Sequence, residues 1–406
     1  MASQIFGGVG VASGIAVASV IAAEISGNDA LSGLANTSQV LGGALLTIPI
    51  VSLMARRGRR IGLVISYAVG TVGAGLALFA TATGSFALLL TGTFLFGAST
   101  TANSQSRFAA VDLAPPSRRG LQLSLVVWAA TIGSAAGPNL IGFGAGLATG
   151  FDLPKLAGPW AISAVGFLLA MVLLMVSLRP DPLLTARALA EVDVPADPKA
   201  SRGSVAEGIR VLRSNAPART GAIAIAAGHI VMISIMVMTP IHMAHGGAQI
   251  EVIGFVISMH IIGMYALSPV VGYLTDRIGS GRVILLGVAI LLASCAFAGL
   301  SATGFSINLT AGLVLLGLGW SCTMVAGSAQ LSAAVPVGER ASAQGASDVV
   351  MGLAGASGGA LAGVIVAVLG FGYLATLMAG VTLLLGAYTL RHPCHTENPV
   401  ASLPIK

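Results

Sequence analysis

Apolar runs of about 20 residues recur along the whole chain, and a helix of that length crosses the roughly 30 Å hydrocarbon core of a bilayer. Charged residues make up only 8% of the 406 residues, about a third of their usual share in soluble proteins. Glycine is frequent, at 54 residues, and small residues let membrane helices approach closely. We therefore expect an all-α membrane protein that crosses the bilayer many times.

Glycine, proline or charged residues separate the apolar runs and define twelve expected spans. One long polar segment, rich in proline, aspartate and arginine, divides them into six plus six. The predicted organisation is an N-terminal six-helix half at 1–179, a central loop at 180–218, a C-terminal six-helix half at 219–390 and a tail at 391–406. The expected spans cover residues 5–25, 32–54, 61–82, 86–109, 121–147, 159–179, 219–243, 250–274, 281–303, 307–334, 341–369 and 371–390.

Nearly all basic residues lie in loops on one side of the expected bundle. Of the 20 lysines and arginines, only Lys155 falls clearly on the other side. Loops rich in lysine and arginine stay in the cytoplasm, so both termini, the central loop and the tail are predicted to be cytoplasmic. The basic residues are thus interpreted as topology determinants in the lipid bilayer, and no nucleic-acid partner is expected.

A loop motif in the second half resembles a signature of the major facilitator superfamily. Between the eighth and ninth spans the sequence reads GYLTDRIGSGR, in which the signature Gly-x-x-x-Asp-Arg-x-Gly is matched by Gly272, Asp276, Arg277 and Gly279. The equivalent first-half segment, VSLMARRGRR, has Val51 and Ala55 in place of the glycine and the aspartate. The resemblance covers the whole chain. It implies twelve transmembrane helices in two six-helix halves and transport by alternating access.

The fifth span carries GSAAGPNLIG, which is similar to the Gly-x-x-x-Gly-Pro motif of antiporters in the same superfamily. The matching positions are Gly133, Gly137 and Pro138. Glycine-proline bends also serve helix packing in many transporters, so an exchange function and a packing function both remain open.

Two pairs of soft metal ligands occupy neighbouring spans. Met232 and Met236 are spaced i, i+4 on the seventh span, and His260 and Met264 have the same spacing on the eighth. Each pair therefore shares a helix face, and both are expected roughly 15 Å below the outer surface. Thioether sulfur with imidazole selects copper, above all Cu(I). Without a nearby carboxylate or thiolate, magnesium, calcium and structural zinc are not expected.

The two segments that contain these pairs read MISIM at 232–236 and HIIGM at 260–264. They resemble the paired motifs of the CcoA-like copper importers, also called the CalT family. The resemblance implies copper uptake across the bacterial cytoplasmic membrane, with copper supplied to the assembly of cbb3-type cytochrome c oxidase. Copper is then the transported substrate, no permanently bound cofactor is expected, and the residues that carry over are Met232, Met236, His260 and Met264.

Other functions fit the same residues. Methionines commonly serve as packing in membrane helices, and a buried histidine can simply hydrogen-bond across helices. An organic-solute or drug/proton antiporter would use His260 to take the proton and the methionines as an adaptable apolar pocket. A sensor or assembly factor that binds copper without moving it is a third possibility. No nucleophile–base pair or nucleotide-binding loop is visible, so an enzyme is not expected.

Secondary candidates lie around these pairs. A first contact point for incoming metal is predicted at the outer end of the seventh span, at His242, Met243 and His245. His229 is either a further ligand or an interior hydrogen-bonding group. A cluster in the tail could pass copper to a cytoplasmic chaperone; it comprises His392, Cys394 and His395.

Polar residues inside other spans suggest a proton path and a latch. Asp348, about two turns into the eleventh span, is a candidate for proton coupling because buried carboxylates form relays in transporters. A polar network with a structural role is predicted at Asn103, Gln105, Arg107 and Asp112. Uncharged polar residues expected to line the cavity are Asn36, Gln39, Asn139, Gln330 and Gln344.

Overall fold

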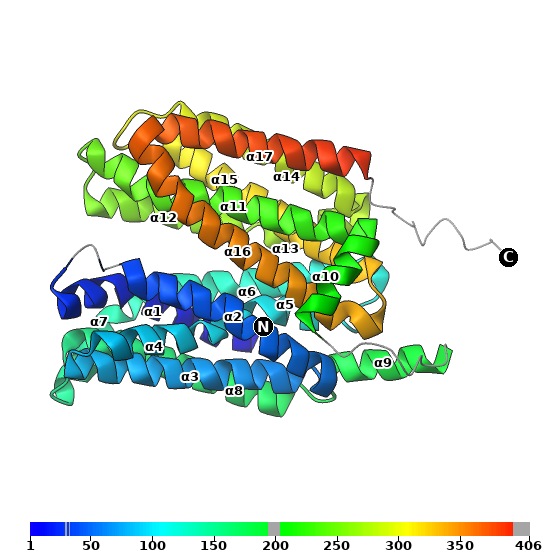
Figure 1. The fold of residues 1–406 in the computed structure, drawn as a ribbon, viewed down its shortest axis with the longest axis horizontal. Helices are drawn as coiled ribbons and strands as arrows, with labels where there is room; N and C mark the ends of the chain where they lie inside the picture. Colours follow the sequence, from blue (N-terminus) through cyan, green and yellow to red (C-terminus); the bar gives the residue numbers. More distant parts are fainter. Residues whose placement is uncertain (29–30, 32, 194–203, 393–406) are drawn as a thin grey trace. The chain divides into compact units, whose positions relative to one another are not determined.

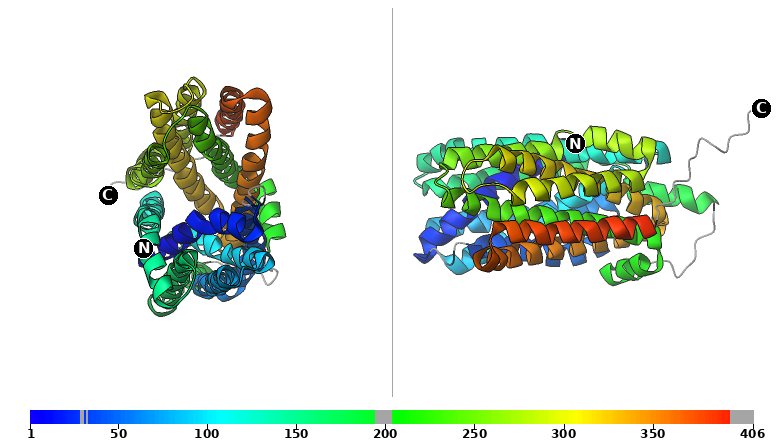
Figure 2. Two further views of the ribbon diagram at one scale, coloured as in Figure 1. Left: turned by 90° about the vertical axis from the view of Figure 1, so that its left-hand side faces the viewer. Right: turned by 90° about the horizontal axis from the view of Figure 1, so that it is seen from above.

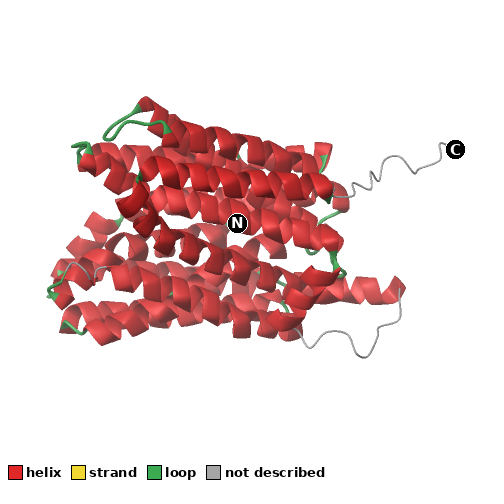
Figure 3. Ribbon diagram, turned by 45° about the horizontal axis from the view of Figure 1, so that its top comes forward, coloured by secondary structure: helices red, strands yellow, loops and turns green. Residues whose placement is uncertain are grey.

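The computed structural model describes residues 1–28, 31, 33–193 and 204–392. These residues form helices joined by short turns and loops, and no strand occurs among them (Figure 3). The helices, labelled in Figure 1, are α1 (Ala2–Ser26), α2 (Gly33–Arg57), α3 (Arg59–Thr83), α4 (Phe86–Phe96), α5 (Ala98–Ala109), α6 (Arg119–Asn139), α7 (Ile141–Gly150), α8 (Gly158–Ser177), α9 (Pro182–Asp193), α10 (Val205–Ser214), α11 (Ala216–His245), α12 (Ile250–Tyr265), α13 (Ser268–Ile278), α14 (Ser280–Gly299), α15 (Ile307–Ala334), α16 (Val337–Leu369) and α17 (Phe371–Arg391).

Eleven helical segments in the described part of the chain are long and apolar enough to cross a membrane. The remaining expected span, 86–109, is present as α4 and α5, which are divided at Gly97. Two other expected spans are also divided, α6 from α7 at Leu140 and α12 from α13 at Ala266–Leu267. The expected twelve-span, all-helical architecture is therefore confirmed.

The central segment differs from the expected polar loop, because it contains the two helices α9 and α10. Asp181 explains where α9 begins. Its carboxylate Oδ1 accepts hydrogen bonds from the backbone N–H groups of Leu183 and Leu184, at 3.0 and 3.1 Å, and Pro182 stands at the first position of the helix. An acidic cap followed by proline is a strong helix start. The polar composition of the segment predicts a loop and so does not indicate this helix.

The chain forms two compact units. Unit 1 comprises Met1–Leu113, Ala129–Ile209 and Val337–Gly352, and unit 2 comprises Ala114–Trp128, Arg210–Pro336 and Leu353–Lys406. Figure 2, left, views the helices of each unit end-on. Two long helices, α6 and α16, each contribute one part to each unit.

Close helix packing through glycine dominates unit 1. Its core contains an aromatic cluster in which Phe96 lies 5.4 Å from Trp160 and 5.0 Å from Phe167, measured between ring centroids. In the antiporter-like motif, a side chain at Gly133 would meet the backbone of α1 at Gly8, and Ser13 of α1 donates a 3.1 Å hydrogen bond to the carbonyl of Gly137. These two glycines let α6 lie directly against α1.

Candidate functional site

Helix α15 is the element that positions the four predicted copper ligands within unit 2. Both α11 and α12 pack extensively against α15, whereas they touch each other only slightly. In Figure 1 the labels of these three helices lie together in the upper part of the picture. The positions of the methionine pair on α11 and the histidine–methionine pair on α12 are therefore both set by packing against α15.

His260 is fully buried, and one side of its imidazole ring is fixed. Its Nδ1 lies 2.8 Å from the backbone carbonyl oxygen of Leu313 on α15. A carbonyl only accepts, so Nδ1 donates, and a neutral ring then carries its lone pair on Nε2. That Nε2 atom is buried and has no hydrogen-bond partner among the described residues. Metal-binding histidines characteristically donate their other nitrogen to a carbonyl in this way.

Two glycines hold α12 against α15 beside His260. A side chain at Gly317 of α15 would clash with the carbonyl of His260 and the amide nitrogen of Met264. A side chain at Gly263 would clash with the carbonyl of Val314. Met264 itself is buried. The backbone turn that carries both predicted ligands of α12 is therefore fixed by direct backbone contact with α15.

Gly263→Val is expected to separate α12 from α15 and to destabilise the protein by about 1–3 kcal/mol, the usual cost of overpacking a filled interior. The matched control is Gly254→Val in the same helix, where an added side chain would meet open space. Thermal unfolding of the two variants in the same detergent tests this. Equal melting temperatures would show that the contact with α15 is not tight.

The methionine pair of α11 lies at the same level of α15. His229, one turn before Met232, accepts a 3.2 Å hydrogen bond at Nδ1 from the indole N–H of Trp320. The same Trp320 ring packs edge-on against Tyr265, the neighbour of Met264, at 5.7 Å between centroids. The next turn of α11, with buried Met232, therefore lies beside the turns of α15 that contact α12. Met236 is half-buried on the following turn.

The remaining metal candidates have different environments. His242 is buried, stacks on Phe371 at 4.2 Å between centroids, and has Nε2 3.3 Å from the hydroxyl of Ser301. Met243 is buried and His245 is exposed. His392 is exposed at the end of α17, and the other two residues of the tail cluster, Cys394 and His395, lie outside the described residues.

Within the described residues, no group of three or more histidine, cysteine, aspartate and glutamate side chains is placed to hold a metal ion. The predicted ligand set differs from such groups, because three of its four members are methionines.

The loop motif of the second half caps a helix in unit 2. The carboxylate of Asp276 accepts hydrogen bonds from the backbone N–H groups of Gly120 and Leu121, at 2.7 and 2.9 Å, in the first turn of α6. Gly279 has φ +90°, a conformation that favours glycine. The guanidinium group of Arg277 lies 5.4 Å from the ring centre of Tyr273. The motif thus connects α13 to α6.

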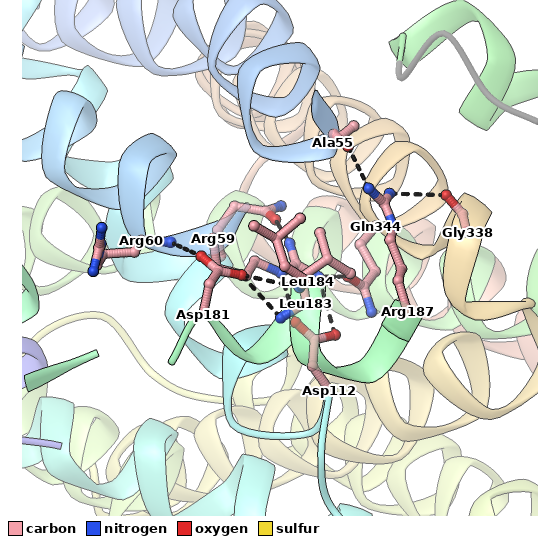
Figure 4. A network of polar contacts seen from close by, with 11 residues as sticks. Ala55, Arg59, Arg60, Asp112, Asp181, Leu183, Leu184, Arg187, Gly338 and Gln344 are labelled. Atoms are coloured by element: carbon pink, nitrogen blue, oxygen red, sulfur yellow. Dashed lines mark hydrogen bonds and ion pairs between the residues drawn. The ribbon is translucent and has the colours of Figure 1, made fainter. Parts of the chain in front are cut away.

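A buried polar network lies in unit 1. Arg59 is fully buried, forms a 2.9 Å ion pair with Asp112, and donates to Gln105 at 2.8 Å and to Gln344 (Figure 4). The carboxylate of Asp348 accepts from the amide of Gln105 at 2.7 Å.

The proton-coupling candidate Asp348 is therefore part of this network, and it forms a 2.5 Å ion pair with Arg107. Asn103, predicted to belong to the same latch, instead accepts a 2.7 Å hydrogen bond from the hydroxyl of Tyr67.

The interpretation of the basic residues as topology determinants misses the role of several arginines. Arg59 is buried and ion-paired, and Arg187 of α9 bonds two other helices. The sequence Asp-Pro at 181–182 is the one signal that could have located α9. The burial of Arg59 has no local signature, because Asp112 and Gln344 are far away in sequence.

The comparisons with known proteins agree with this architecture. The family model of the Major Facilitator Superfamily matches residues 1–248 and 222–403. An uncharacterised transporter of this type from Bacillus subtilis, YdeG, is 37% identical over 93% of this chain and 86% of its own. The riboflavin transporter RfnT of Brucella anthropi is 26% identical over 83% of this chain and 80% of its own.

Among solved structures, the human organic anion transporter MFSD10 has a TM-score of 0.75 at 15% identity, covering 96% of this chain and 97% of its own. At that identity the likeness shows the fold alone. Fold, spans and family model together define a multi-pass secondary transporter. The chain belongs to the major facilitator superfamily, whose members are transporters and generally not enzymes.

Proposed function

We propose that this transporter imports copper across the bacterial cytoplasmic membrane, and that the copper supplies the assembly of cbb3-type cytochrome c oxidase. The ligands in this proposal are Met232, Met236, His260 and Met264. The observation that carries it is the buried Nε2 of His260, which has no partner among the described residues while Nδ1 is fixed by the carbonyl of Leu313. An unsatisfied buried acceptor is costly unless it serves a ligand.

The chemistry of these residues suits a transported copper ion. Imidazole and thioether are neutral ligands that favour Cu(I), so a bound ion keeps its single positive charge. Several thiolates would hold the ion far more tightly and would slow its release. The ligand set therefore fits a site that loads and empties in each cycle of alternating access.

The surrounding residues extend the proposal at both ends of the path. Of the predicted entry residues, exposed His245 would offer the first ligand to incoming metal, since Met243 is buried and His242 is engaged by Ser301 and Phe371. His392 and the tail beyond it would pass copper to a chaperone in the cytoplasm. Asp348 would couple transport to protons if its protonation releases Arg107.

A second candidate is an organic solute, and the relationship to a riboflavin transporter favours it. The cluster of His229, Trp320 and Tyr265 offers aromatic faces against which a planar molecule could stack. In this case the methionines form an apolar wall, and His260 is the group that takes the proton.

Met236→Leu distinguishes the two candidates, because leucine keeps the apolar volume of this half-buried side chain and removes its sulfur. In cells that lack their own copper importer, the copper uptake rate of the variant is expected to be about tenfold lower than that of the parent chain, or lower still. A tenfold change corresponds to about 1.4 kcal/mol of binding free energy, the size of one good ligand contact. Riboflavin uptake measured beside it serves as the control. Copper uptake at the parent rate, or riboflavin uptake that depends on the protein, would favour the organic solute.

A further inference from the structure

The first-half loop lacks the carboxylate that caps a helix in the second half. In unit 2, Asp276 accepts two backbone N–H bonds from the first turn of α6. The equivalent position in unit 1 is Ala55, which is buried, and Val51 stands where the motif has glycine. A side chain at Gly345 of α16 would clash with Val51, so α2 and the first turns of α16 lie in direct contact without the acidic residue.

Arg187 of α9 supplies the missing polar connection. Its Nη1 donates to the carbonyl of Ala55 at 2.6 Å, near the end of α2, and its Nη2 donates to the carbonyl of Gly338 at 3.0 Å, in the first turn of α16 (Figure 4). One planar guanidinium group thus bonds two helices at once, which suits the fixed fork of arginine and not the single ammonium of lysine. The positive charge also favours the carboxyl end of α2.

Asp181 anchors the beginning of α9 to α3. Its Oδ2 accepts a 2.7 Å hydrogen bond from the backbone N–H of Arg60, while its Oδ1 caps α9 itself (Figure 4). One carboxylate therefore caps the amino ends of two helices. Gly58 has φ +91°, and a side chain there would clash with the Asp181 carboxylate. The turn before α3 is shaped to receive it.

An apolar contact completes the attachment. Leu183 of α9 is fully buried in a small cluster with Ala55 of α2 and Ala341 of α16, and Val337 packs against the cluster. The outward side of α9 is different, since Leu189 is 62% exposed. Helix α9 is therefore held on unit 1 by a cap, an arginine fork and a buried leucine, all on one face.

We propose that α9 is a strap, defined by Asp181, Leu183 and Arg187, that takes over the role of the absent loop carboxylate and holds the first turns of α16 against α2. Helix α16 continues from Gly352 into unit 2. By sequence, α2 belongs to the first six-helix half and α16 to the second. Alternating access moves one half of such a transporter against the other, so we expect the start of α16 to leave α2 during the cycle. The strap sets how readily this happens, and Arg187 is a positioning residue for transport.

The test measures how often Ala341, buried under the strap, becomes accessible. In a chain whose three native cysteines are replaced by alanine, Ala341→Cys provides a single reporter for a water-soluble maleimide. Removing the fork with Arg187→Ala is expected to speed labelling by about tenfold or more, since each hydrogen bond to a charged group contributes about 1.5–3 kcal/mol. Arg187→Lys keeps the charge but not the fork and is expected to give an intermediate rate.

Leu189→Ala, two residues further along α9 and exposed, is the matched control and is expected to label at the parent rate. Equal rates for Arg187→Ala and Leu189→Ala in monodisperse protein would overturn the strap. If Arg187→Ala does not fold, the labelling rates of Asp181→Asn and Arg187→Lys replace it in the test. Labelling of both variants at the parent rate would then overturn the proposal. The assay needs no transported substrate, so its outcome is separate from that of the copper proposal.

Discussion

His260→Ala is expected to reduce protein-dependent copper uptake to the level of cells that carry no transporter. The substitution removes the one imidazole of the proposed site, and thioethers alone would be left to hold the ion. It also removes the hydrogen bond to Leu313, which is 2.8 Å long and fixes the ring. Loss of the hydrogen bond that orients a metal-binding histidine typically weakens metal affinity by about 10–100-fold. Loss of the imidazole ligand itself weakens the affinity further.

His260→Gln separates the two effects. Its amide group can still donate to the carbonyl of Leu313, but it presents a hard oxygen in place of the soft Nε2. Uptake is expected to remain absent. Ser258→Ala on the same helix is the control, because Ser258 is exposed and bonds only the carbonyl of Gly254 in its own helix. Copper uptake by His260→Ala at the rate of Ser258→Ala would remove His260 from the site.

Asp112→Asn is expected to destabilise the protein by about 3–5 kcal/mol. The change preserves the shape of the side chain but leaves the fully buried charge of Arg59 without its carboxylate, and an uncompensated buried charge carries a cost of that size. Asp152→Asn, at an exposed position, is the matched control and should stay within about 0.5 kcal/mol of the parent. Thermal unfolding in detergent, followed by the loss of monodisperse protein, measures both.

A double variant shows whether the effect comes from the charge. Arg59→Met combined with Asp112→Leu removes both members of the ion pair, and apolar replacement of a buried pair is often neutral or stabilising. It is expected to recover much of the stability lost in Asp112→Asn, although Gln105 and Gln344 then lose their partner. If Asp112→Asn unfolds at the same temperature as Asp152→Asn, the buried positive charge of Arg59 does not depend on the Asp112 carboxylate for its stability.

The sequence predicts the parts of this structure that depend on long, regular patterns. Twelve spans follow from apolar runs. The periodicity of methionine and histidine predicts two ligand pairs at one level, and in the structure His229 of α11 and the His260–Met264 turn of α12 contact Trp320 and Gly317 of α15.

Features that depend on distant partners could not be read in the same way. The burial of Arg59 requires Asp112, in the turn that follows α5, and Gln344 of α16. The docking of α9 depends on carbonyl groups of α2 and α16, and backbone acceptors leave no trace in composition. His260 was recognised as unusual from sequence, but only its contact with Leu313 shows which ring nitrogen remains for a ligand.

Copper uptake into liposomes that contain only the purified protein tests the central claim most directly, because no other transporter or chaperone is present. We expect saturable, temperature-dependent accumulation of radioactive Cu(I) by the parent chain and none by His260→Ala. Met236→Leu is expected to accumulate much less copper than the parent, and riboflavin is not expected to compete. Accumulation that is unchanged in both variants, or a parent chain that moves riboflavin and not copper, would contradict it.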